Sequence, residues 1–404
     1  MTKGEKGFIY SCLLVTLISE MLLSPFYPQL FSDYFQVDGV QTASLFIICC
    51  RLVVMIMTPI WVVAAKKWGF RKLIMIALTV MAGCKILLPM SHTFPQFLAA
   101  SLVLLFFQSS IYLLYPAIVA SSKNDDEKVK ATTTYLFVFH GSVIVSGIAG
   151  SFVVNQLFPL NSYYVFALMD LILAAAGCFL LSNHEAITSK ETFRKKENLS
   201  KGVKWQGEFL VYLLIVFLFY IGHHTIRPYF TVFLDNSFTI SKQESSLLYV
   251  MPSLVAIMLQ FSLPKHYLQT HVRAILISLM GITAGLLFIQ ALVGPLWLFV
   301  LIRMMYGMCF FISLAAVDIL FFKMKIGKTS PLSYSLVASV QNAALLFSPM
   351  AALMMVKHNG TEGPFLLSGF LLIGSALGTA LLLMMMYKSS LYQIKRGVEQ
   401  HENF

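Results

Sequence analysis

An acidic residue lies inside the first long apolar segment of the chain, which runs from about residue 8 to residue 31. Glu20 is followed there by two prolines, Pro25 and Pro28. Inserting a carboxylate near the middle of a lipid bilayer costs about 2.5–3.5 kcal/mol of free energy, so an acidic residue at this depth indicates a functional role. A carboxyl group favours its neutral form when it is buried and its ionised form beside a cation. An acid that alternates between two such environments can carry a proton, and we predict this role for Glu20.

Each predicted proton carrier has a structural alternative. For Glu20 it is an ion pair with Arg51. A second acid in an apolar segment, Asp170, is also predicted to carry protons, and its alternative is an ion pair with Lys85. Charged side chains that lie within a membrane are expected to have a partner or to face water.

A similar stretch returns about 200 residues later. When Pro25 is aligned with Pro228, Glu20 falls on His223. Weaker matches align Gln41-Thr-Ala-Ser-Leu45 with Gln243-Glu-Ser-Ser-Leu247 and Ala82-Gly83 with Ala284-Gly285. We therefore predict two repeats, each directing an ionisable group of its first helix at a shared cavity.

Other polar and aromatic residues share helix faces with these groups, because positions three, four and seven apart lie on one side of a helix. Core packing is the alternative for the tyrosines. Guanidinium groups bind carboxylates with two hydrogen bonds, so several arginines suit a carboxylate-bearing ligand. The predicted substrate-binding residues are Glu20, Tyr27, Arg51, Gln108, Tyr112, Tyr115, His223, Arg227, Tyr249, Arg303, Gln341 and Asn342, with Ser253 sharing a face with Tyr249.

Metal and enzyme chemistry are not predicted. His223 and His224 are adjacent, and adjacent side chains diverge by about 100° on a helix, which makes them a poor chelating pair. No nucleophile and base occur at a useful spacing. No cofactor is expected.

The elements that carry these residues are apolar segments long enough to cross a bilayer. The chain has 404 residues, of which 58% are hydrophobic and 12% charged, whereas soluble domains carry about 25% charged residues. We predict an all-α membrane protein with two six-helix bundles. Its twelve transmembrane helices are expected at approximately 8–32, 42–65, 72–91, 96–120, 132–155, 163–181, 208–233, 244–264, 274–293, 295–321, 331–356 and 364–387.

The distribution of basic residues predicts the orientation. Of the 29 Lys and Arg residues, only Lys242 and Lys357 fall in predicted outer loops. Such a bias places basic segments in the cytoplasm. Both termini are therefore predicted to be cytoplasmic, in a multi-pass protein of the cell inner membrane. The net charge of +11 then needs no nucleic-acid partner.

The longest polar stretch, residues 182–207, separates six predicted spans from six. We predict an N-terminal bundle at 1–181, a cytoplasmic basic linker at 182–207 and a C-terminal bundle at 208–404. The remaining loops are short, and no G-x-x-x-x-G-K-[ST] motif occurs. Direct coupling to ATP is therefore not expected.

Two partial motifs carry a family resemblance. The loop Lys66-Lys67-Trp68-Gly69-Phe70-Arg71-Lys72 is similar to the pattern Gly-x-x-x-Asp-Arg/Lys-x-Gly-Arg-Lys/Arg between helices 2 and 3 of the major facilitator superfamily, with Lys66 in place of the acid. The fifth span carries Ser142-x-x-x-Ser146-Gly147-x-x-Gly150-Ser151, which resembles the helix 5 motif of drug/proton exporters. The alternatives are a topology signal for the loop and plain helix packing for the small residues.

The resemblance implies alternating access between two bundles, with gating residues at Lys67, Gly69 and Arg71. It implies a secondary active exporter, proton-coupled, for a small carboxylate-bearing or zwitterionic metabolite, similar to metallophore and siderophore exporters of the staphylopine type. A multidrug/proton antiporter is the first alternative, and a non-transporting sensor or scaffold is the second. The expected partners are a small-molecule substrate, protons and the lipid bilayer, with the protein as a monomer.

Overall fold

The computed structural model describes residues 2–122, 124–181, 207–262, 265–292, 294–324 and 331–402. Over these ranges all regular elements are helices, and no strand occurs. The first six predicted spans contain α1 (Lys3–Met21), η1 (Ser24–Phe26), α2 (Tyr27–Phe35), α3 (Gly39–Trp68), α4 (Phe70–Leu87), η2 (Leu88–Met90), α5 (Phe94–Gln108), η3 (Ile111–Leu113), α6 (Leu114–Ala120), α7 (Asp125–Val153), η4 (Pro159–Asn161) and α8 (Ser162–Leu180).

The second six spans are equally helical. They contain α10 (Gly207–Ile226), η5 (Arg227–Tyr229), α11 (Phe230–Ser237), α12 (Lys242–Ser262), α13 (Lys265–Leu292), α14 (Leu296–Lys323), α15 (Pro331–Asn359) and α16 (Gly363–Glu402). Within the described ranges, eleven helical segments are long and apolar enough to cross a membrane. The remaining predicted span, α12, is a 21-residue helix. Each of the twelve predicted spans thus coincides with helix, and the predicted all-helical membrane fold is confirmed.

The first helix of each repeat is broken at the aligned proline. α1 ends at Met21 and is followed by the 3₁₀ turn η1, which contains Pro25. α10 ends at Ile226 and is followed by the 3₁₀ turn η5, which contains Pro228. Proline lacks the backbone N–H that a continuous helix needs, so both helices change course at the same position of the repeat.

The contacts of the described residues divide the chain into two units. One unit is Met1–Glu197 with Arg227–Ile257, and the other is Asn198–Ile226 with Met258–Phe404. Residues 227–257 thus group with the N-terminal bundle by their contacts, and the predicted division at the polar linker stays a prediction. Thr231 explains part of the grouping: its hydroxyl donates to the Pro25 carbonyl over 2.5 Å, and it accepts from Gln29 Nε2 over 3.0 Å. The predicted linker lies outside the described residues except for Gly207.

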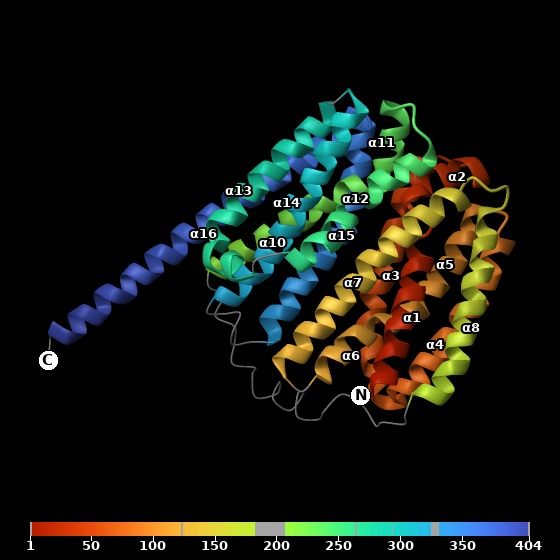
Figure 1. Ribbon diagram of the computed structural model, residues 1–404, viewed down its shortest axis with the longest axis horizontal. Coiled ribbons are helices and arrows are strands. Elements are labelled where there is room, and N and C mark those ends of the chain that lie inside the picture. Colours follow the sequence, from red (N-terminus) through yellow and green to blue (C-terminus); the bar gives the residue numbers. More distant parts are fainter. Residues whose placement is uncertain are drawn as a thin grey trace. The chain divides into compact units, whose positions relative to one another are not determined.

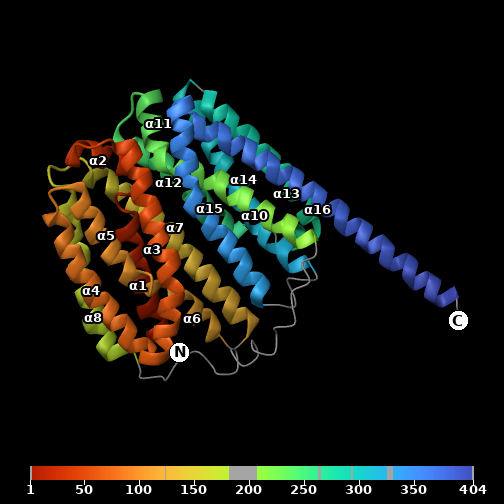
Figure 2. The ribbon, with the colours of Figure 1, turned by 180° about the vertical axis from the view of Figure 1, so that it is seen from behind.

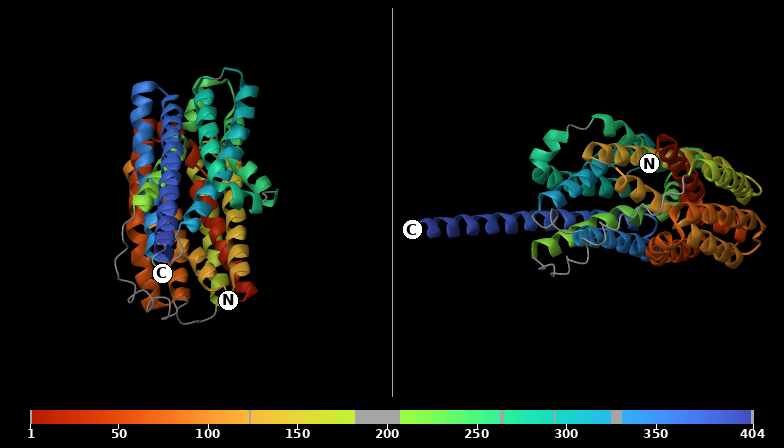
Figure 3. Two further views of the ribbon diagram at one scale, coloured as in Figure 1. Left: turned by 90° about the vertical axis from the view of Figure 1, so that its left-hand side faces the viewer. Right: turned by 90° about the horizontal axis from the view of Figure 1, so that it is seen from below.

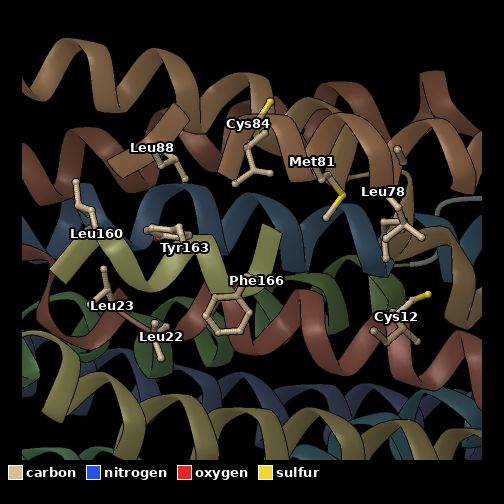
Figure 4. Packing of buried hydrophobic residues seen from close by; sticks show 14 of the residues in the cluster. Cys12, Leu22, Leu23, Leu78, Met81, Cys84, Leu88, Leu160, Tyr163 and Phe166 are labelled. Carbon is tan, nitrogen blue, oxygen red and sulfur yellow. The ribbon is translucent and has the colours of Figure 1, made fainter. Parts of the chain in front are cut away.

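In the first unit, α1 packs on α7 and α8, and α4 packs on α8 and α5 (Figures 1 and 2). Figure 4 shows the apolar side chains between three of these helices, among them Cys12 of α1, Met81 of α4 and Phe166 of α8. This apolar core fixes the rotation of each helix about its own axis. The helix rotation then decides which polar side chains meet.

The small residues of α7 allow close helix contacts. A Cβ on Gly150 would lie 1.8 Å from the carbonyl oxygen of Leu22, and one on Gly147 would lie 2.3 Å from a methyl group of Val250. Helices approach this closely only where side chains are small. Packing therefore accounts for the small residues of the fifth span, as the alternative interpretation of that motif expected.

In the second unit, α10 packs on α15 and α16, and α13 packs on α14 and α16. The apolar part of α16 ends at Tyr387. The helix itself continues to Glu402, beyond the other helices of its unit (Figure 3).

Candidate functional site

Glu20 lies at the centre of a small hydrogen-bonded group in the first unit. Gln108 Nε2 donates to Glu20 Oε2 over 3.0 Å, and the Tyr112 hydroxyl donates to the same oxygen. Gln108 also donates to the Tyr112 hydroxyl over 2.7 Å. Gln108 ends α5, Tyr112 lies in the following turn η3, and Glu20 is in the last turn of α1. The structure thus brings together three of the predicted site residues.

The structure does not show the ion pair of Glu20 with Arg51 that the alternative interpretation expected. Neither side chain belongs to an ion pair in the described part of the chain. The half-buried Arg51 lies on α3.

Asp170 and Lys85 form a buried ion pair. Lys85 Nζ lies 2.7 Å from Asp170 Oδ2, and both side chains are 0% exposed. The ammonium group also lies 5.8 Å from the ring centre of Phe166. The pair joins α4 to α8 inside the apolar core, which is the structural alternative expected for Asp170. A proton-carrying role for Asp170 stays a prediction.

A second polar group in the first unit surrounds Arg227. Arg227 Nη2 donates to the Tyr249 hydroxyl over 3.1 Å, and its guanidinium carbon lies 5.7 Å from the Tyr249 ring centre. One turn further along α12, Ser253 Oγ lies 3.2 Å from His140 Nδ1 of α7. His140 is not among the predicted binding residues. Its position as an ionisable residue within an apolar span was the signal that could have identified it.

In the second unit His223 contacts the fourth helix of its repeat. His223 Nδ1 lies 2.5 Å from the Tyr306 hydroxyl, and its ring stacks on Phe310 with 3.5 Å between the ring centres. When Gln108 of the fourth span is aligned with Tyr306, Tyr112 falls on Phe310. Each repeat therefore sets the ionisable group of its first helix against the same two positions of its fourth span.

Arg303 differs from the expectation that it faces a cavity. Its side chain is 5% exposed. The guanidinium lies 4.9 Å from the ring centre of Tyr306, and Nη1 donates to Gln290 Oε1 over 3.4 Å. The rotation of α14 directs the Arg303 side chain toward α13, where it packs against the Tyr306 ring.

The remaining predicted binding residues have mixed surroundings. Tyr115 stacks on Tyr135 with 4.0 Å between the ring centres, and Tyr27 is 9% exposed within an aromatic cluster, so packing describes both. Gln341 Nε2 donates to the Tyr220 hydroxyl over 3.0 Å. Asn342 is exposed and donates to a carbonyl of its own helix.

The predicted gating residues lie around the junction of α3 and α4. Gly69 adopts φ +81°, a value that favours glycine. Arg71 Nη2 donates to the Cys178 carbonyl over 2.5 Å and so caps the last turn of α8 in its own unit. Lys67 is exposed. A gating role for these residues stays a prediction.

The comparison with protein families decides the family. A model described as Major Facilitator Superfamily matches residues 9–221, more than half of the chain. The chain belongs to the major facilitator superfamily. It is a multi-pass membrane transporter rather than an enzyme.

Solved structures of this superfamily share the fold at low sequence identity. The human organic anion transporter MFSD10 is 15% identical with a TM-score of 0.65, over 94% of this chain and 100% of that one. A D-xylose–proton symporter is 13% identical with a TM-score of 0.70, over 93% of this chain and 96% of that one. No curated protein sequence matches the chain.

Proposed function

We propose that this transporter is a proton-coupled exporter of a small carboxylate-bearing or zwitterionic metabolite, such as a metallophore. The observation that carries the proposal is a pair of half-buried arginines within apolar spans. Arg51 and Arg227 have no carboxylate partner in the described ranges, and Arg227 donates to the Tyr249 hydroxyl.

A guanidinium held within a membrane is unfavourable unless a counter-charge or water meets it. Arginine is the side chain best suited to a carboxylate, because its planar donors match the two oxygens. An anionic cargo would supply the charge that the described residues do not supply.

The hydrogen bonds of Glu20 support a proton-carrying role. As an ionised group, its Oε2 accepts from both Gln108 and Tyr112. Protonation adds a donor and removes an acceptor site, so this triangle of hydrogen bonds has to rearrange. Because the triangle joins α1 to α5 and η3, the rearrangement links the proton to the contact between helices.

Orientation and direction are part of the proposal. The concentration of basic residues on one side favours cytoplasmic termini. The proposal also places the protein in the cell inner membrane, as a monomer. Two solved relatives by fold are named for an organic anion and for a sugar moved with protons. At their low identities, they support the general mode of transport and leave the cargo open.

A multidrug/proton antiporter is the second candidate, and Glu20 favours it. Glu20 accepts hydrogen bonds from Gln108 and Tyr112, and neither of these side chains carries a positive charge. A solitary acid beside aromatic rings suits a lipophilic cation. This candidate predicts that Arg227→Ala leaves the transport of hydrophobic cations intact.

The test is metabolite profiling of spent medium and cell extracts from cells with and without the gene. The proposal predicts that a carboxylate-rich, metal-chelating compound accumulates inside cells that lack the gene. The Glu20→Gln variant should fail to restore its export. Equal levels in the two strains would remove the metallophore proposal, and accumulation of lipophilic cations alone would favour the antiporter.

A further inference from the structure

We propose that His140 and Ser253 complete an oxyanion-binding cluster with Arg227 and Tyr249, and that this cluster holds a carboxylate of the cargo. We call these four residues the Arg227 cluster. The inference rests on the proposed anionic cargo and assigns its binding to particular side chains. It adds His140, which the sequence analysis did not place in the site.

The cluster draws on three elements of one unit. Arg227 lies in η5, directly at the break of the seventh span, where the backbone leaves the helix. Tyr249 and Ser253 are four residues apart on α12, so they lie on one face. His140 comes from α7 and contacts Ser253 over 3.2 Å. Arg227 and His140 thus contact two residues on the same face of α12.

The donors of the cluster suit an oxyanion. The Tyr249 hydroxyl accepts from Arg227, so its own proton remains to be donated elsewhere. Arg227 uses one of its five N–H groups in that bond. No described carboxylate pairs with the guanidinium. A carboxylate placed here would receive charge-assisted hydrogen bonds, which are about twice as strong as neutral ones.

Simple packing of α7 on α12 does not account for the polar contact. Along the same pair of helices, Gly147 meets Val250 so closely that a Cβ would lie 2.3 Å from its methyl group. That contact shows that small and apolar residues are enough to pack these helices. A histidine–serine pair at the same seam costs desolvation that an apolar pair would avoid. Hydrogen bonds to a bound carboxylate would offset the desolvation cost of the histidine–serine pair.

The experiment measures carboxylate binding to the purified full-length protein by thermal stabilisation at constant ionic strength. The probes are citrate, glutamate and histidine, each beside its methyl ester. The variants are Arg227→Gln, His140→Gln and Ser253→Ala. The control is His358→Gln, because His358 is exposed in the last turn of α15. The melting temperature without probe shows whether each variant is folded.

We expect at least one carboxylate, and none of the esters, to stabilise the unmodified protein. Arg227→Gln should abolish this effect, while His140→Gln and Ser253→Ala should each weaken the apparent affinity about tenfold or more. The control should bind as before. If His140→Gln does not fold, Ser253→Ala alone decides.

Two results would overturn the inference. Full affinity in folded His140→Gln and Ser253→Ala variants, with loss only in Arg227→Gln, would exclude His140 and Ser253 from the site. The absence of any carboxylate effect on the unmodified protein would remove the whole cluster. In that case, the same protein is reconstituted into proteoliposomes. Proton-driven flux of a lipophilic cation there would show that the protein is a proton-coupled transporter without this anion site.

Discussion

The buried pair of Lys85 and Asp170 allows the sharpest prediction about the fold. Both side chains are fully buried and 2.7 Å apart. Replacing one partner leaves an uncompensated buried charge, and this costs about 3–5 kcal/mol. We expect Lys85→Met alone and Asp170→Leu alone to be destabilised by this amount. The double variant should regain most of the loss, since apolar replacement of a whole buried pair is often neutral or stabilising.

A thiol-reactive fluorescent dye measures this unfolding in detergent once the exposed Cys178 and the half-buried Cys49 and Cys50 are replaced by Ser, because the remaining cysteines are buried and react only when the protein opens. The matched control is the surface pair of Lys242 and Asp33, whose charged atoms are 3.7 Å apart with 27% and 69% of the side chains exposed. Exposed pairs contribute about 0–1 kcal/mol, so Lys242→Met should change little.

A double variant as unstable as either single variant would refute the reasoning, because the loss would then not come from an unpaired charge. The same double variant also tests the predicted proton role of Asp170. A folded double variant that keeps proton-coupled flux would assign the pair to structure. A folded one that loses it would support proton coupling.

Three other expectations follow from single contacts. Glu20→Gln should fold and should make flux independent of pH, as measured in proteoliposomes; unchanged pH dependence would exclude Glu20 as the proton carrier. Gly150→Ala should lower stability by about 1–3 kcal/mol, since its Cβ would meet the Leu22 carbonyl oxygen at 1.8 Å, whereas Gly141→Ala in the same helix has open space. Equal melting temperatures of the two variants would contradict this packing. Tyr229→Phe removes a buried hydroxyl that donates to the Val40 carbonyl over 2.7 Å, and this should lower the free energy of unfolding by about 1–3 kcal/mol. The exposed Tyr164→Phe is the control. Equal melting temperatures of the two variants would show that the Tyr229 hydroxyl does not stabilise the fold.

Features that depend on local sequence could be predicted. Hydropathy and length place eleven apolar spans and the helix α12, and the aligned prolines Pro25 and Pro228 mark both helix breaks. The sequence also predicts the Lys85–Asp170 ion pair as the structural alternative for Asp170, because two opposite charges in apolar segments need partners.

Features that depend on helix rotation could not be predicted. Arg303 and Tyr306 are three residues apart and share a side of α14, but spacing alone does not say whether that side meets α13 or an open space. The contact of His140 with Ser253 depends on how α7 and α12 approach. The grouping of residues 227–257 with the N-terminal bundle depends on contacts more than 200 residues apart in sequence, such as Gln29 with Thr231.

The central claim is that arginines within the membrane bind an anionic cargo. Its most direct test is pH-gradient-driven flux of a carboxylate and of its methyl ester in proteoliposomes, with unmodified protein and with the Arg51→Gln and Arg227→Gln variants. We predict flux of the carboxylate only, and its loss in both variants. Equal flux of acid and ester, unchanged in the variants, would contradict the claim.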